Sequence, residues 1–186
     1  MSDGAAGAEK TALVDASSAI LLHRAGLFAT VTATYRVVMA ESVYAEVTAP
    51  GHYGASTFGR FYREGRFAMV NPPDPPAPDE RLPGGLHAGE RDTLLLYHCG
   101  CGDFIVIDDG KAAAHCRDTG IPYLNALLMP RVLHLSGCLS AETGAKAAEA
   151  ITAAGRYADW VVCYAREAAD EVLTPFLPGK PVNAGR

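Results

Sequence analysis

The chain has 186 residues, of which 49% are hydrophobic and 20% are charged, and its formal net charge is -5. A chain this apolar and this weakly charged can bury enough surface to exclude intrinsic disorder, and its length suits one compact domain. It has no apolar run of the ~18–20 residues that a transmembrane helix needs, and its acidity argues against a nonspecific nucleic-acid coat.

The first ten residues are mostly small, with no basic segment followed by a hydrophobic one, so we expect no secretory signal and a cytoplasmic protein. Residues 1–10 are expected to form a flexible leader, and residues 178–186 a tail. Five cysteines are an odd number in a chain too long to need disulfide cross-links. They are therefore interpreted as reduced thiols.

In the first half of the chain, apolar β-prone runs alternate with helical segments. Strands are predicted at Thr11–Val14, Tyr35–Met39 and Phe67–Val70, and helices at Ala19–Leu27, Glu41–Val47 and Thr57–Glu64. Ser17 or Ser18 is expected to cap the first helix. Six prolines between residues 71 and 85 then predict an extended loop.

The second half continues the alternation. Strands are predicted at Phe104–Ile107 and Ile121–Leu124, and helices at Gly89–Cys99, Lys111–Asp118, 125–135, 141–154 and 157–173. Gly120 is a suitable C-terminal residue after the second of these helices. Short apolar strands that alternate with helices indicate an α/β fold with a buried, mostly parallel sheet, in one domain over residues 11–177.

Aspartates follow two of the predicted strands. Asp15 ends the first strand, and Asp108 and Asp109 end the strand in the middle of the chain. Ligands of parallel α/β sheets bind at the carboxyl ends of the strands. Each aspartate alone could simply be a helix N-cap. Two such sites at equivalent places favour a shared divalent cation.

Two further acids could join them. Glu46 lies at the margin of the apolar face of its predicted helix. Glu90 shares a helix face with Leu94 and Tyr97, whereas Asp92 is turned by about 200° from Glu90, so only one of the two acids can face a common site. The face shared with Leu94 favours Glu90. The alternative is that either acid only favours the positive end of the helix dipole.

Four motifs in this order resemble PIN domains, especially the Gly-Glu branch related to VapC-type toxins. They are Leu13-Val14-Asp15-Ala16-Ser17, Glu41 to Val47, Gly89-Glu90-Arg91-Asp92, and Ile105 to Asp109. The resemblance implies a three-layer α/β/α sandwich and a ribonuclease dependent on Mg²⁺ or Mn²⁺. It implies that Asp15, Glu46, Glu90 and Asp108 are the catalytic and metal-binding acids, with Ser17, Asp92, Asp109 and Lys111 as accessory residues.

The sequence departs from the family pattern in three places. Ala16 follows the first aspartate where a threonine is common, and an arginine often found on the helix after Asp109 is absent, although Lys111 could supply its charge. The segment 50–85 is also longer than in compact toxins. These departures concern substrate handling more than metal binding.

A basic and aromatic segment precedes the proline-rich loop. Arg60, Arg63 and Arg66 recur every three residues, with Phe58, Phe61, Tyr62 and Phe67 between them. The arginines could bind RNA phosphates while the aromatic rings stack on bases. Alternatively, this is an amphipathic element whose aromatic rings fill the core and whose arginines face water.

The first functional hypothesis is a metal-dependent endoribonuclease that cuts single-stranded RNA, as the toxin of a toxin–antitoxin pair. A small antitoxin protein and a homodimer are the partners that the resemblance implies. The alternative is a catalytically inert PIN-like binding or scaffold module. A third class, a phosphohydrolase or response-regulator-like fold, needs an aspartate, a Ser or Thr and a Lys at separate strand ends, and no convincing set is present.

Overall fold

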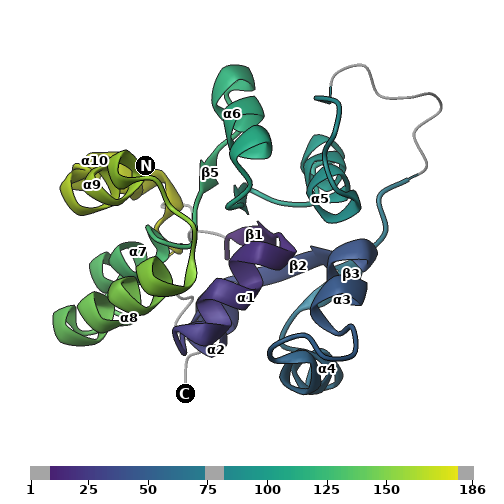
Figure 1. The fold of residues 1–186 in the computed structure, drawn as a ribbon, viewed down its shortest axis with the longest axis horizontal. Coiled ribbons are helices and arrows are strands. Elements are labelled where there is room, and N and C mark those ends of the chain that lie inside the picture. Colours follow the sequence, from purple (N-terminus) through teal and green to yellow (C-terminus); the bar gives the residue numbers. More distant parts are fainter. Residues whose placement is uncertain (1–8, 74–81, 180–186) are drawn as a thin grey trace, which may run out of the picture.

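The fold is built on a parallel sheet. The structure, a computed structural model, describes residues 9–73 and 82–179 (Figure 1). Five parallel strands pair in the order β3-β2-β1-β4-β5. The strands are β1 (Thr11–Val14), β2 (Arg36–Ala40), β3 (Ala68–Val70), β4 (Phe104–Val106) and β5 (Tyr123–Leu124). The predicted α/β fold with a parallel sheet is confirmed.

Helices connect the strands and continue to the C-terminus. They are α1 (Ala16–Arg24), α2 (Phe28–Thr34), α3 (Glu41–Val47), α4 (Ala55–Arg63), α5 (Ala88–His98), α6 (Gly110–Thr119), α7 (Met129–Leu135), α8 (Ala141–Ala154), α9 (Asp159–Glu167) and α10 (Asp170–Leu173), followed by the 3₁₀ turn Thr174–Phe176. In Figure 1, α5 and α6 lie on one side of the strands, and α1, α7 and α8 lie on the other. This is the expected three-layer arrangement. No helix of the described ranges is long and apolar enough to cross a bilayer.

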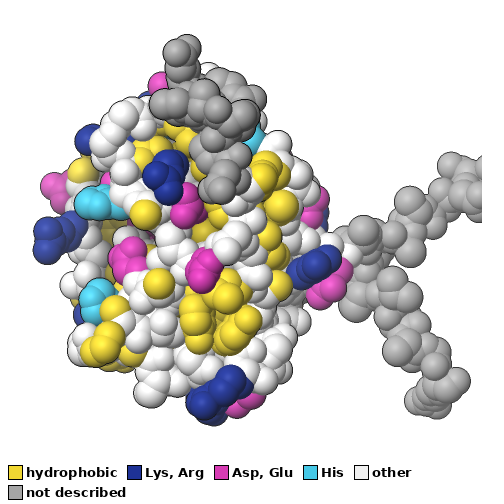
Figure 2. All heavy atoms as spheres, turned by 90° about the vertical axis from the view of Figure 1, so that its right-hand side faces the viewer, with side chains coloured by type: hydrophobic (Ala, Val, Ile, Leu, Met, Phe, Trp, Pro, Cys, Tyr) yellow, Lys and Arg dark blue, Asp and Glu magenta, His cyan; other side chains and the backbone are white. Residues whose placement is uncertain are grey.

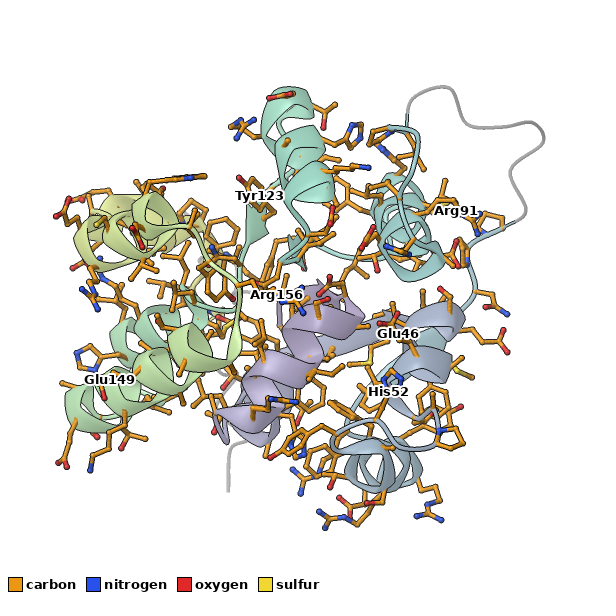
Figure 3. All side chains as sticks on the ribbon, in the orientation of Figure 1. Glu46, His52, Arg91, Tyr123, Glu149 and Arg156 are labelled. Carbon is orange, nitrogen blue, oxygen red and sulfur yellow. The ribbon has the colours of Figure 1, made fainter. Side chains whose placement is uncertain are left out.

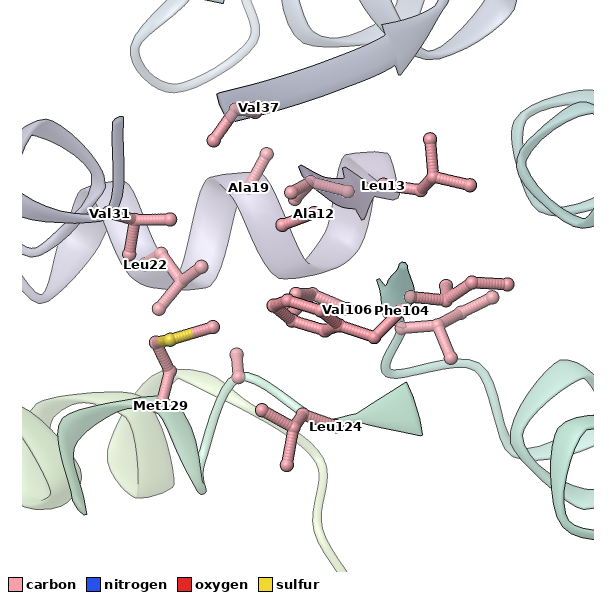
Figure 4. Close-up of a cluster of buried hydrophobic side chains, with 14 of the residues drawn as sticks. Ala12, Leu13, Ala19, Leu22, Val31, Val37, Phe104, Val106, Leu124 and Met129 are labelled. Atoms are coloured by element: carbon pink, nitrogen blue, oxygen red, sulfur yellow. The ribbon is translucent and has the colours of Figure 1, made fainter. Parts of the chain in front are cut away.

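The core lies on both faces of the central strand. Ala12 and Leu13 are successive residues of β1, so their side chains point to opposite faces, and both are fully buried. Figure 4 shows Ala19 and Leu22 of α1 within the buried cluster around the strands. Because β1 is covered on both faces, its apolar run shows no polar alternation.

Several predicted boundaries were wrong. The first helix begins at Ala16, because the carboxylate of Asp15 caps it by accepting a hydrogen bond from the Ser18 amide. A second helix, α2, follows it and was not predicted, because its valine and three threonines are β-branched residues typical of strands. The helix predicted over 157–173 is interrupted at Ala168 and Ala169, where the backbone is extended.

Parts of the predicted leader, proline-rich loop and tail lie outside the described residues, namely residues 1–8, 74–81 and 180–186. The helix predicted over Glu41–Val47 has the observed bounds, and Gly120 takes the predicted left-handed conformation, with a φ of 73°, after α6.

The C-terminal turn packs against the start of the sheet. The hydroxyl of the buried Tyr35 donates a hydrogen bond of 2.8 Å to the carbonyl of Phe176. The Phe176 ring meets the ring of Phe104 edge to face, with centroids 5.4 Å apart. The last described segment is therefore part of the core.

Gly102, just before β4, lies against the central strand. A Cβ atom at this position would stand 2.6 Å from Cγ of the fully buried Leu13. We expect Gly102→Ala to lower the free energy of unfolding by ~1–3 kcal/mol through overpacking, measured by urea denaturation. Gly59→Ala in α4 is the control, because nothing lies within 4 Å of its Cβ position and alanine favours the helix. Equal effects of the two substitutions would contradict the expectation.

Candidate functional site

The direction in which the chain extends the sheet reverses at β1. From β1 the chain adds β2 and β3 on one side, and then returns to add β4 and β5 on the other. Ligands of open α/β sheets bind at such a switch point, beyond the carboxyl ends of the strands. Asp15 directly follows β1, and Asp108 comes two residues after β4. The Asp15 amide also donates a hydrogen bond to the Val106 carbonyl, so the two strand ends stay together.

A chain of hydrogen bonds joins the two aspartates. The Ser18 amide donates to Asp15 Oδ1, and the Ser18 hydroxyl donates to Asp108 Oδ2, each over 2.7 Å. Asp108 also accepts from the Ala126 amide at 3.0 Å and from the Tyr157 hydroxyl. Ser18 therefore fixes both carboxylates from the first turn of α1.

An acidic pocket opens beside this pair. It has a volume of about 520 Å³ and is lined by Asp15, Ala16, Ser17, Glu46, His52, His87, Gly89, Glu90 and Asp109. We call it the acidic pocket. In Figure 3, Glu46 and His52 mark the α3 side of this region, and Figure 2 shows Asp and Glu side chains distributed over the right-hand face of Figure 1.

Two of the lining acids are held by helix starts. Glu90 accepts a hydrogen bond of 2.8 Å from the His87 amide at the start of α5. Asp109 accepts from the amides of Lys111 and Ala112 at the start of α6. The carboxylate of Glu46 lies close to Gly89, because a Cβ there would stand 3.7 Å from Glu46 Oε2. Glu90 and Asp109 therefore each bind backbone amides at the start of a helix and also line the acidic pocket.

Burial makes the charge of Asp15 unfavourable. Asp15 is 2% exposed, and burial together with the nearby charge of Asp108 raises its pKa to about 8, in spite of the hydrogen bonds from Ser18. Burial also raises the pKa of Asp108 above its usual value. In the described part of the chain, no Lys or Arg forms an ion pair with either of them or with Glu46, Glu90 or Asp109. This arrangement of buried carboxylates therefore favours the binding of a cation.

The structure brings together three of the four expected catalytic acids at the pocket. Asp15, Glu46 and Glu90 line it, but Asp108 does not, and its neighbour Asp109 does. The Asp108 carboxylate instead accepts hydrogen bonds from the Ser18 hydroxyl and the Ala126 amide.

The expected accessory residues divide in the same way. Ser17 lines the acidic pocket, whereas Lys111 does not. Asp92 is turned elsewhere, because it accepts hydrogen bonds from Ser42 and from its neighbour Arg91. The helical geometry that favoured Glu90 over Asp92 therefore agrees with the placement of both.

The basic segment forms α4. Arg60, Arg63 and Arg66 are exposed at or after this helix, whereas Phe58, Phe61 and Phe67 are buried. The guanidinium groups of Arg60 and Arg66 lie over the Phe61 ring and pair with Glu64. These three phenylalanines fill the core and are not available to stack on bases. The arginines stay accessible.

Sequence reasoning missed Ser18 and Tyr157 as members of the site. Ser17 was the serine expected at the site, and Ser18 is the next residue of the same helix. The sequence pattern alone does not say which of the two serines faces the aspartates. Tyr157 is 49 residues from its partner Asp108, in the link between α8 and α9, and no local pattern marks it.

The donor set fits a hard divalent cation, although the side chains do not converge on one point. Mg²⁺ and Mn²⁺ prefer carboxylate oxygens, which Asp15, Glu46, Glu90 and Asp109 supply. Among residues 9–73 and 82–179, no three His, Cys, Asp or Glu side chains are gathered tightly enough to hold an ion as they stand. Coordination of one ion therefore requires these side chains to move toward each other.

The Tyr157 hydroxyl is tested by removing it. We expect Tyr157→Phe to lower the free energy of unfolding by about 1–2 kcal/mol, because buried Asp108 loses a hydrogen bond. Chemical denaturation in the presence of EDTA measures the effect. Tyr164→Phe on the exposed face of α9 is the matched control, with no expected change. An unchanged stability of Tyr157→Phe would show that this contact contributes nothing.

A family model described as a PIN domain (DUF3368) matches residues 11–158, which include β1 to β5 and the acidic pocket. No curated protein and no solved structure matches the chain.

Proposed function

Because the chain belongs to the PIN-domain family, whose members are generally nucleases, we propose that it is a metal-dependent endoribonuclease acting on single-stranded RNA. The observation that carries the proposal is the buried Asp15 at the switch point. Its charge is opposed by burial and by Asp108, and no basic side chain of the described residues offsets it. A divalent cation would offset it.

In the proposed mechanism, the carboxylate oxygens of four acids would hold the ion, namely Asp15, Glu46, Glu90 and Asp109. The bound ion supplies charge neutralisation for a phosphodiester and a water of lowered pKa. Ser18 holds Asp15 and Asp108 in fixed orientations through its amide and its hydroxyl. When it is ionised, Asp108 places a second negative charge beside Asp15 and thereby strengthens the attraction for a cation.

The function is tested with a labelled single-stranded RNA. We expect cleavage with Mn²⁺ or Mg²⁺ and none with EDTA, and weaker or no cleavage of duplex RNA and single-stranded DNA. RNA binding without cleavage in any metal would contradict the enzyme and favour the inert PIN-like module. Cleavage that persists in EDTA would contradict the role of the acidic pocket.

The exposed arginines of α4 are proposed to bind the RNA backbone. Among the three, Arg63 is exposed and forms no ion pair with a described residue, so its charge is available. We expect Arg63→Gln to raise KM about threefold and to leave kcat unchanged, because a phosphate contact made equally in ground and transition states affects binding alone. Steady-state cleavage kinetics measure this. Arg117→Gln on α6 is the control, and a lower kcat in Arg63→Gln would contradict a purely binding role.

We further propose that the protein is the toxin of a toxin–antitoxin pair. This rests on the family membership and on the resemblance of the four acidic motifs to VapC-type toxins. Controlled expression in a bacterial host should arrest growth, and Asp15→Asn should not. Normal growth with wild-type protein at the same level would contradict the toxin proposal and leave the nuclease proposal standing.

A further inference from the structure

A second cavity lies outside the acidic pocket. It has a volume of about 660 Å³ and is bounded by α7, α8 and α9. It shares no lining residue with the acidic pocket. Most of its lining is apolar and small, including Pro130, Ala148 and Val162. Its size and lining are those of a small-molecule site, in which few polar groups fix the orientation of an apolar ligand.

Small residues and a loosely packed helix leave this space open. On α8 the cavity is lined by Gly144, Ala145 and Ala148, whose side chains are too short to fill it. Across from them, α9 has no buried residue, and its Trp160 is 69% exposed. The helix begins directly after the region matched by the PIN-domain model, so one wall of the cavity lies outside that region.

The polar groups of the cavity favour an anion. Arg131 and Arg166 line it together with a single carboxylate, Glu149, in a chain whose net charge is -5. Nη2 of Arg131 pairs with Asp170 at 2.5 Å, whereas Nη1 is buried and has no hydrogen-bond partner among residues 9–73 and 82–179. A buried guanidinium N–H without an acceptor is unfavourable, and a carboxylate oxygen is a strong acceptor for it.

We propose that the cavity between α7, α8 and α9 binds an apolar monocarboxylate of the medium-chain fatty-acid class. The carboxylate accepts from Arg131 Nη1, and the alkyl chain lies along the small residues of α8 beneath α9. This site is separate from the nuclease proposal, because its ligand and its residues are different.

The experiment is a titration of the full chain with decanoate. Trp160 is the chain's only tryptophan and stands on the helix that covers the cavity, so its fluorescence reports binding. We expect a saturable fluorescence change below the micelle concentration and a raised thermal unfolding midpoint. Acetate and decanol, which carry only the charge or only the chain, should bind at least ~10-fold more weakly.

Matched variants test whether decanoate binds in this cavity. Ala148→Leu places a larger side chain in the cavity and should strongly weaken decanoate binding, whereas Ala150→Leu, on the exposed side of α8 and outside the lining, should leave it unchanged. Arg131→Gln should weaken binding about 10-fold, and Arg117→Gln should not. Unchanged affinity in Ala148→Leu, equal binding of decanol and decanoate, or the absence of saturable binding would each overturn the proposal. So would a concentration-dependent dimer that Ala148→Leu abolishes, because the cavity would then belong to an interface between copies.

Discussion

Asp15→Asn is expected to reduce metal-dependent RNA cleavage by about 10³-fold or more. The substitution removes the carboxylate that in its charged form would hold the cation, and about 4 kcal/mol of transition-state stabilisation corresponds to that factor. The fold should persist, because asparagine is as good an N-cap as aspartate and its oxygen can still accept from the Ser18 amide. Single-turnover cleavage of a labelled RNA with Mn²⁺ measures the loss.

Two controls give this result its meaning. Asp118→Asn removes an exposed aspartate that only pairs with Arg117, and should cleave like the wild type. Binding of Mn²⁺, followed by calorimetry, should weaken in Asp15→Asn together with cleavage. Full cleavage by Asp15→Asn would refute the proposed site, and lost cleavage with unchanged Mn²⁺ affinity would move the ion away from Asp15.

The second large effect is a fall in stability with rising pH when metal is removed. The folded state holds a proton on Asp15 up to pH about 8, whereas the unfolded chain releases it near the ordinary value of 3.8. The folded state therefore binds more protons between these values, and the free energy of unfolding falls by about 1.4 kcal/mol per pH unit for this group. The raised pKa of Asp108 acts in the same direction.

Urea denaturation in EDTA at pH 5 and pH 8 measures this fall. Asp15→Asn should lose up to about 4 kcal/mol less than the wild type over that interval, since it has no proton to release at this position. The comparison between the two proteins isolates Asp15 from His23, whose lowered pKa acts in the opposite direction. Excess Mn²⁺ should flatten the wild-type profile, because a cation favours the charged carboxylate. Identical profiles of the two proteins in EDTA would contradict the raised pKa.

The sequence was sufficient for the parallel sheet, because the buried strands are continuous apolar runs and the turns between elements carry Gly, Pro or Asp. It was not sufficient for α2, in which three threonines and one valine resemble a strand. The break between α9 and α10 was also missed. Ala168 and Ala169 have a high helix propensity, so the sequence predicts no break, whereas in the structure Ala168 and Leu173 pack into the core on either side of the extended Ala169.

The residues that line the acidic pocket could be predicted only in part from the sequence. Position at a strand end and helix face identified Asp15, Glu46 and Glu90. Asp108 and Asp109 are neighbours after one strand, so their side chains point in different directions, and sequence alone could not say which faces the pocket. The Tyr157 contact depends on the path of the chain after α8, which only tertiary packing determines.

The contact of Phe176 with Tyr35 and Phe104 bears on where an autonomous folding unit ends. The family match stops at residue 158, but Phe176 satisfies the hydroxyl of a fully buried tyrosine and covers an aromatic ring of β4. A fragment excised at the family boundary would expose that tyrosine and that ring to water. The segment after residue 158 thus covers part of the hydrophobic core, and the fragment without it would be prone to aggregation.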